Sequence, residues 1–157
     1  MKSAESLRPR TWVLPPVPYA VAMVGGWWLD RHVARLPLDL GAIGIALAYA
    51  MIAAGVGLFG WALATLRRHR TTVNPYKGAH ALCTDGPFAL SRNPIYLGDW
   101  FVLAGVAFWL HSVWPLLLSP MVWLALRFGV IGHEERHLEA KFGDDYRSYM
   151  RRVRRWI

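Results

Sequence analysis

One uncharged stretch constrains the fold more than any other feature of the sequence. Residues 38–66, LDLGAIGIALAYAMIAAGVGLFGWALATL, carry no charge after Asp39. A helix needs roughly 20 mostly apolar residues to cross a hydrocarbon core of about 30 Å. This stretch is therefore long enough to span a membrane. Small residues recur along it and predict close contact with a neighbouring helix; they are Gly41, Ala48, Gly55, Gly57 and Gly60.

Three further apolar stretches extend this prediction to an all-α membrane protein of about four transmembrane helices. They are residues 12–29, 95–110 and 114–132, and the last two are close enough in sequence to form a helical hairpin. The hydrophobic share of the whole chain is 55%, above the 45–50% or so of an ordinary soluble protein. A signal peptide is the alternative for residues 12–29, but no A-x-A-like cleavage site follows them.

The segment after the hairpin, residues 133–157, is charged and is predicted to form a cytoplasmic amphipathic tail. Its apolar residues recur at near-helical spacing, so this tail could lie along the membrane interface. They are Leu138, Phe142, Tyr146, Tyr149 and Val153.

The basic residues predict how the chain is oriented. Most of the 18 Lys and Arg lie before the first span, in the loop 67–94 or in the tail. The positive-inside rule therefore places both termini and this loop in the cytoplasm, and we expect the cell inner membrane. The net charge of +8 and the ending RRVRRWI also suit nucleic acid. Juxtamembrane basic residues more often contact membrane lipids, so no nucleic-acid partner is expected.

The single cysteine, Cys83, excludes an intramolecular disulfide and a multi-cysteine metal site. Charges near the ends of the expected spans are costly, which makes Asp99, Arg127 and the pair Glu134–Glu135 functional candidates. An ion pair between helices, joining Arg127 to Asp99 or to Glu134, is the structural alternative.

The sequence HEERH, His133–His137, fits the H-E-x-x-H pattern of zinc proteases. In that pattern two histidines on one helical face bind the metal and the glutamate activates water. No third ligand can be assigned, and the longer metzincin pattern fails because Ala140 stands where it requires Gly. An intramembrane zinc protease stays open as an alternative.

Several short motifs in the second half of the chain agree with one family. HALCTDGPFALSRNPIYLG precedes the apolar hairpin, and EERHLEAKFGDDYRSYMRRVRRWI follows it. This order and spacing resemble the isoprenylcysteine carboxyl methyltransferase and phospholipid methyltransferase family of integral membrane enzymes. In that family a block G-x-Y-x-x-x-R-H-P-x-Y-x-G precedes a hairpin, and a Glu-Glu pair leads to F-G-x-x-Y-x-x-Y. The match covers about residues 70–157, and the first two spans match only in hydrophobic character.

The resemblance implies a single methyltransferase domain over residues 1–157 that uses S-adenosyl-L-methionine at the cytoplasmic face. The cofactor-binding residues that it implies are His80, Ala81, Leu82, Cys83, Phe88, Asn93, Pro94, Ile95, Tyr96, Gly98, Glu134 and Glu135. Arg92 and Arg127 are the candidates for a catalytic role, with Arg127 holding an acceptor carboxylate or phosphate. Two positions depart from the family pattern, because Asn93 replaces a His and Phe88 replaces a Tyr.

The chemistry of the cofactor agrees with this set. Carboxylates suit its ammonium and sulfonium groups, and a guanidinium suits its carboxylate. The acceptor implied is a prenylcysteine-like carboxylate or a lipid amine that enters from the bilayer. A nicotinamide-dependent membrane reductase and a non-catalytic membrane scaffold remain as further alternatives. No resident metal is expected for the methyltransferase.

Overall fold

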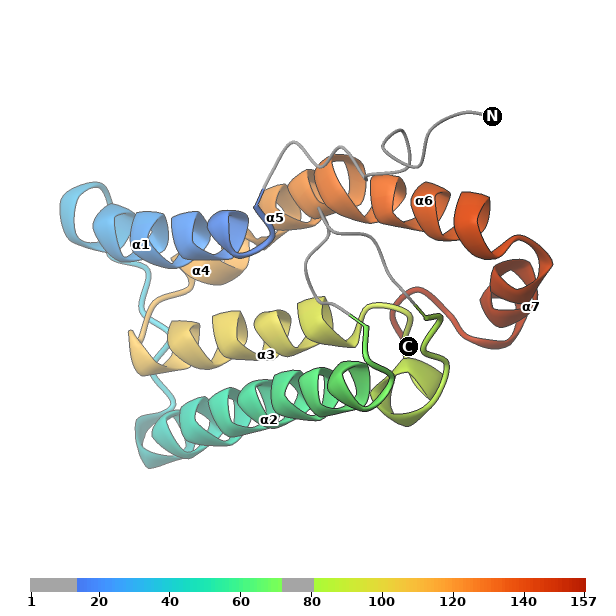
Figure 1. The fold of residues 1–157 in the computed structure, drawn as a ribbon. Helices are drawn as coiled ribbons and strands as arrows, with labels where there is room; N and C mark the ends of the chain where they lie inside the picture. Colours follow the sequence, from blue (N-terminus) through green and yellow to red (C-terminus); the bar gives the residue numbers. More distant parts are fainter. Residues whose placement is uncertain (1–13, 72–80) are drawn as a thin grey trace.

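A computed structural model describes residues 14–71 and 81–157, and in this part of the chain the fold is built from helices (Figure 1). Helical structure agrees with the prediction from the apolar stretches. The elements in chain order are α1 (Pro16–His32), α2 (Gly41–Arg68), the 3-10 turn η2 (Gly86–Ala89), α3 (Pro94–Trp109), α4 (Trp114–Leu117), α5 (Ser119–Leu126), the π-helical turn η3 (Arg127–Ile131), α6 (Gly132–Phe142) and α7 (Asp144–Arg152).

Helices α2 and α3 lie side by side along most of their length (Figure 1). Their closest approach is at glycines, where a Cβ added to Gly55 would lie 2.5 Å from the carbonyl oxygen of Gly98. A Cβ added to Gly105 would lie 2.8 Å from the carbonyl oxygen of Ala48. The prediction of close helix contact is thus confirmed at Ala48 and Gly55. It fails at Gly41, Gly57 and Gly60, where an added Cβ would meet no atom within 4 Å.

Elements α4 to α6 follow one another directly, and the turn η3 interrupts the α-helical pattern between α5 and α6. Helix α1 packs against α3, α4 and α5. The main core cluster forms where these helices meet, and its buried members are Tyr19, Ala22, Tyr96, Leu103, Val122, Leu126, Val130 and Ile131. Tyr19 donates a hydrogen bond from its hydroxyl to the carbonyl oxygen of Tyr96 at 2.8 Å, which ties the start of α1 to the start of α3.

Among the described residues, two helices are long and apolar enough to cross a membrane. They are Gly41–Arg68 and Trp114–Phe142. Large apolar side chains on α2, such as Ile43 and Val56, are exposed, which is typical of a surface that faces lipid rather than water. Helices α1 and α3, with 17 and 16 residues, fall short of the same length criterion. The count of four transmembrane helices therefore stays a prediction.

The helix boundaries differ from the expected spans in one important place. The expected fourth span ended at residue 132, but helical structure continues through α6 to Phe142. Gly132 and the residues after it have no helix-breaking feature, and the break comes at Gly143, whose positive φ of 53° suits glycine. The expected first span began at residue 12, which lies outside the described residues.

The tail does not have the exposed apolar face that its sequence pattern suggested. Tyr146 and Tyr149 on α7 are only 2% and 3% exposed. Tyr149 donates a hydrogen bond to the carbonyl oxygen of Phe88 at 2.6 Å, so α7 packs on the loop before α3. Protein covers these two side chains, and the position of the tail along the membrane interface stays a prediction.

The described loop 81–93 and the C-terminal residues lie at the same end of the helices (Figure 1). The end of α1 and the α3–α4 connection lie at the opposite end, where the Ser112 hydroxyl donates to Asp30 at 2.9 Å. We call these the site end and the distal end. The sequence-based topology placed the loop and the tail together, and this arrangement agrees with it. Which end faces the cytoplasm stays a prediction.

Candidate functional site

The start of α3 is shaped by the sequence Ser91–Pro94. Pro94 is the first residue of α3, where its missing amide hydrogen costs no helix hydrogen bond. Asn93 before it has non-helical dihedral angles, as expected for a residue that precedes proline. Helix α3 then places Tyr96 one turn further along, on the side that faces α1.

Tyr96 connects α3 to the glutamate pair at the start of α6. Its hydroxyl donates to the Glu134 carboxylate and lies 3.0 Å from each of the two oxygens. Asp99 lies one turn beyond Tyr96 and therefore on the same face of α3. This end of the helix bundle thus brings two carboxylates and a tyrosine together from distant parts of the sequence.

The second glutamate, Glu135, is held by two arginines. Arg155 donates from Nε and Nη2 to the two carboxylate oxygens at 2.9 and 2.6 Å. Arg92 Nη1 lies 3.1 Å from Glu135 Oε1, and these two side chains are only 12% and 16% exposed. A bidentate guanidinium pair fixes the orientation of a carboxylate. Glu135 is therefore tied into the protein, whereas Glu134 has Tyr96 as its hydrogen-bond donor.

Arg92 retains unused hydrogen-bonding capacity. Its Nε atom is buried and has no hydrogen-bond acceptor among the described residues, and its Nη1 contact with Glu135 lacks hydrogen-bond geometry. A buried donor without an acceptor is costly. An anionic ligand group would satisfy it.

The last residues of the chain run across the start of α3 and complete this arrangement. The carbonyl oxygen of Arg155 accepts from Asn93 Nδ2 at 2.9 Å and from Ser91 Oγ at 3.2 Å. The carbonyl oxygen of Arg154 accepts from the backbone amide of Arg92 at 3.0 Å. Trp156 packs against the main core cluster. We call residues 153–157 the C-terminal strap.

Burial raises the pKa of two groups outside the apolar spans, Tyr146 on α7 and Cys83 in the loop before α3. It raises the pKa of Tyr146 to about 12, with the nearby Glu135 carboxylate adding to the effect and Arg92 opposing it. Burial also raises the pKa of the Cys83 thiol to about 11, and Asp85 adds to this increase. Both groups are therefore neutral at pH 7.

The other residues implied by the resemblance fall into separate places. The amide of Ala81 donates to the Thr71 hydroxyl at 3.4 Å, Leu82 is half-buried beside it in the sequence, and Ile95 packs against the core cluster. His80 lies outside the described residues. Gly98 is about 200° around α3 from Tyr96 and contacts α2. The resemblance implied that Gly98 binds the cofactor, and the contact observed for it is with α2.

Arg127 occupies the π-helical turn η3, and such turns are frequent at functional sites. Its Nη1 lies 3.9 Å from the position that a Cβ of Gly132 would take, so the side chain extends toward the site end. Within residues 14–71 and 81–157 neither Arg127 nor Asp99 forms an ion pair, and the interhelical pair that was the structural alternative is not seen there.

The histidines of HEERH lie one helical turn apart on α6. His133 Nδ1 and His137 Nε2 are buried and without a hydrogen-bond partner in the described part of the chain. No group of three His, Cys, Asp or Glu side chains in that part could hold a metal ion.

Two residues of the site were not expected from sequence. Arg155 had been grouped with the basic residues that contact lipid, and Tyr19 had been counted only as part of an apolar span. The signal for Tyr19 is a hydroxyl in an apolar stretch, since a buried tyrosine usually needs a hydrogen-bond acceptor. The hydrogen bonds that the Arg155 carbonyl accepts could not be predicted, because this backbone group is present in every residue.

Comparison with known proteins adds the family. A family model described as phospholipid methyltransferase matches residues 43–145. A relative from Haemophilus influenzae, described as an uncharacterized protein, is 36% identical over 63 residues, which make up 40% of this chain and 100% of that protein. No solved structure matches the chain.

Proposed function

The chain belongs to the phospholipid methyltransferase family, and from this premise we propose that it transfers a methyl group from S-adenosylmethionine to a lipid-type acceptor at the site end. Family membership implies methyl transfer and membrane association. The cofactor, the acceptor and the membrane face are the finer parts of the proposal.

The hydrogen bond between Tyr96 and Glu134 is the observation that carries it. Glu134 keeps lone pairs that Tyr96 does not use, so its carboxylate can accept from the ammonium group of the cofactor. The unsatisfied Nε of Arg92 can donate to the cofactor carboxylate. The donor and acceptor groups present therefore fit an amino acid moiety that carries both charges.

The cofactor supplies an electrophilic methyl group on a positively charged sulfur. The protein has to hold the acceptor in line with that methyl group and keep water away, so positioning and electrostatics account for most of the catalysis. The buried rings of Tyr96 and Tyr19 supply apolar surface next to the hydrogen bond between Tyr96 and Glu134.

The acceptor classes make different demands on the protein. A lipid amine loses a proton when its nitrogen gains the methyl group, and the carboxylates of Asp99 and Glu134 are the bases near the start of α3. A carboxylate acceptor loses no proton and would need a cation such as Arg127 to hold it. Asp99 has no ion-pair partner in the described residues, which favours the amine.

Calorimetry with S-adenosylhomocysteine on the purified full chain tests the cofactor. We expect binding by the wild type and a loss of about tenfold to hundredfold in Glu134→Gln, because a charged hydrogen-bond acceptor is lost. Glu139→Gln is the matched control, since Glu139 is a partly exposed glutamate of the same helix that pairs with Arg147. His137→Ala should also retain binding.

Three other results would redirect the assignment. Stoichiometric zinc that disappears in both His133→Ala and His137→Ala, together with no binding of S-adenosylhomocysteine, would favour the protease. Binding of a nicotinamide nucleotide in its place would favour a reductase. Binding of neither cofactor nor metal would leave a scaffold. Transfer of a labelled methyl group to phosphatidylethanolamine or to a farnesylated cysteine derivative then distinguishes the acceptor classes.

A further inference from the structure

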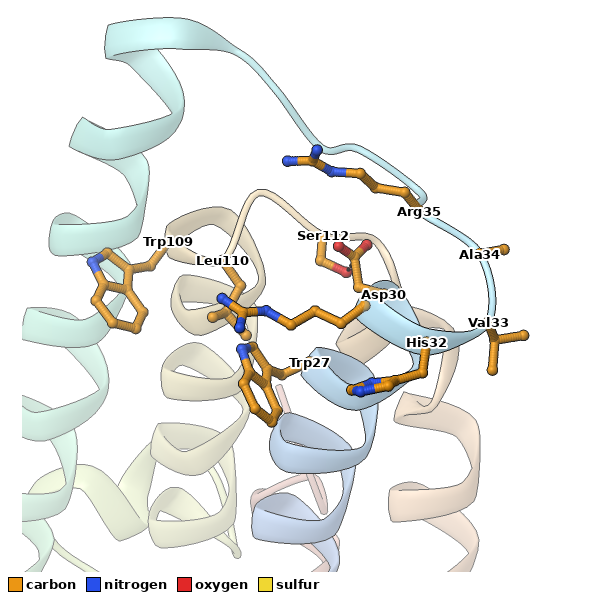
Figure 2. Close-up of a pocket in the computed structure, with 10 residues that line it drawn as sticks. Trp27, Asp30, His32, Val33, Ala34, Arg35, Trp109, Leu110 and Ser112 are labelled. Carbon is orange, nitrogen blue, oxygen red and sulfur yellow. Dashed lines mark hydrogen bonds between the residues drawn. The ribbon is translucent and has the colours of Figure 1, made fainter.

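A pocket of about 690 Å³ lies at the distal end, away from the Tyr96–Glu134 pair. It is formed by the last turns of α1, the loop that follows and the end of α3 (Figure 2). Helix α1 has 17 residues and therefore spans about 25 Å between its start near Tyr96 and this pocket. The pocket is thus separate from the proposed methyl-transfer site.

The charges around the pocket favour an anion. Arg31 and Arg35 line it, and neither has an ion-pair partner within the described residues. The guanidinium of Arg31 lies over the ring of Trp27, 4.8 Å from the ring centroid. In Figure 2, Arg35 extends from the loop after α1 over the same space.

The acidic residue in the pocket wall is already engaged. Asp30 Oδ1 accepts from the Ser112 hydroxyl at 2.9 Å and from the backbone amide of Leu36 at 3.2 Å. Figure 2 shows Asp30 and Ser112 beside each other. These bonds hold the carboxylate in a structural role that joins α1 to the α3–α4 connection. Asp30 forms no ion pair with Arg31 or Arg35 in the described part of the chain, so the two guanidinium groups keep their donors available to a ligand.

Exposed tryptophans indicate how deep the distal end lies in a membrane. Trp27, Trp28 and Trp109 are 40%, 49% and 54% exposed. Tryptophans gather where the hydrocarbon core meets the headgroups. The pocket, which Trp27 and Trp109 line, therefore lies at the level of lipid phosphates rather than in bulk water.

From the paired arginines, the engaged carboxylate and the tryptophan level, we propose that the distal pocket binds the phosphate headgroup of an anionic phospholipid. Arg31 and Arg35 donate to the phosphate oxygens. Trp27, Trp109 and Leu110 supply apolar surface for the glycerol and upper acyl chain, which a free phosphate ion would leave unused. This site is independent of the methyl-transfer reaction.

Thermal unfolding of the full chain in detergent micelles tests the proposal, since a ligand that binds the folded state raises the melting temperature. We expect phosphatidylglycerol to stabilise the wild type more than phosphatidylcholine does. Arg31→Gln/Arg35→Gln should weaken the apparent affinity for phosphatidylglycerol about thirtyfold, from roughly fivefold for each arginine near an anionic headgroup. Arg31→Lys/Arg35→Lys keeps the charge and should retain part of the affinity for phosphatidylglycerol.

Arg67→Gln/Arg154→Gln is the matched control because it removes the same charge from exposed positions at the site end. It should keep the wild-type response. Equal weakening in the two glutamine double variants would overturn the proposal in favour of general attraction to basic surface. Equal stabilisation by phosphatidylcholine would also overturn it. Stabilisation by inorganic phosphate that matches phosphatidylglycerol would assign the pocket to a free anion and exclude the lipid.

Discussion

The hydroxyl of Tyr96 donates to Glu134 and lies 3.0 Å from both carboxylate oxygens, although 38 positions separate the two residues in the sequence. This bond joins α3 to the long helical segment that ends in α6. It also fixes the carboxylate that the proposed function assigns to the cofactor. The loss of this one hydroxyl is therefore a direct test of how the site is organised.

We expect Tyr96→Phe to weaken S-adenosylhomocysteine binding by about tenfold, because a hydrogen bond to a charged group is lost and Glu134 becomes free to rotate. Calorimetry on the purified full chain measures the change. Tyr49→Phe is the control, since Tyr49 is an exposed tyrosine of α2. A wild-type dissociation constant in Tyr96→Phe would show that the bond does not prepare Glu134 for the cofactor.

The contact between α2 and α3 predicts opposite outcomes at two neighbouring glycines. A Cβ on Gly55 would approach both the Gly98 carbonyl and Val102, whereas a Cβ on Gly57 would meet no atom within 4 Å. Gly55→Ala should lower the free energy of unfolding by about 1–3 kcal/mol because the helices must separate. Gly57→Ala should be neutral or slightly stabilising, since alanine is the better helix former.

Melting temperatures of the two variants in the same detergent provide the measurement. Similar melting temperatures would mean that α2 and α3 are not packed through Gly55.

Cys83 predicts a pH dependence of thiol reactivity. Burial, with help from Asp85, raises its pKa from the ordinary value near 9 to about 11. The reactive thiolate is therefore scarce in the folded protein at pH 8. Alkylation by iodoacetamide should be slow there and should reach half of its maximal rate near pH 11, whereas in detergent-unfolded protein the half-maximal rate should come near pH 9.

The same shift contributes to stability with a defined sign. A raised pKa favours the neutral thiol in the folded state, so its contribution is complete below about pH 9 and is lost as the pH rises toward 11. Equal alkylation rates of Cys83 in the folded and unfolded chains at pH 8 would contradict the burial of its thiol.

Sequence patterns predicted the local features of the site well. The apolar stretch 95–110 indicated where α3 lies, and the helix runs from Pro94 to Trp109. The distribution of basic residues placed the loop before α3 and the tail on one side, and the hydrogen bonds of Asn93 and Ser91 to Arg155 join these segments. Such features follow from backbone restrictions and from the alternation of apolar and charged segments.

Sequence patterns did not predict the C-terminal strap. RRVRRWI has the composition of a lipid-contacting segment, yet Arg155 and Trp156 turn inward while Arg154 is exposed. Which arginine turns inward depends on which carboxylate its guanidinium can reach after folding. It also depends on hydrogen bonds to backbone carbonyl groups, which every residue has and which therefore leave no pattern in the sequence. The length of the last helix was missed for a related reason, since charged residues at 133–142 can continue a helix beyond an apolar span.

The strap predicts that Arg155 stabilises the site. Arg155→Gln removes a bidentate pair with the largely buried Glu135 and should lower the free energy of unfolding by about 1–2 kcal/mol, between the values for exposed and buried pairs. For a chain of this size the melting temperature should fall by about 2–8 °C. Arg147→Gln is the control, because Arg147 pairs with Glu139 and Asp144 at the surface, and its melting temperature should match the wild type.

In a Glu135→Gln background, Arg155→Gln and Arg147→Gln should give the same melting temperature. That result would confirm that Arg155 acts through Glu135. An equal effect of both arginine variants would contradict a special role for the strap.

Arg127 predicts a separation between binding of the acceptor and binding of the cofactor. Its guanidinium carbon lies 5.8 Å from the ring centroid of Phe128, and it has no ion-pair partner within the described residues. An unpaired cation in a membrane helix is costly unless a ligand or water reaches it. We expect Arg127→Gln to raise the KM for a phosphate-containing lipid acceptor by roughly tenfold, because one charged contact is lost, and to leave the dissociation constant of S-adenosylhomocysteine unchanged.

Arg127→Lys should recover part of the loss, and Arg136→Gln on the exposed side of α6 should behave as the wild type. A parallel loss of cofactor affinity in Arg127→Gln would place this guanidinium at the cofactor instead of the acceptor.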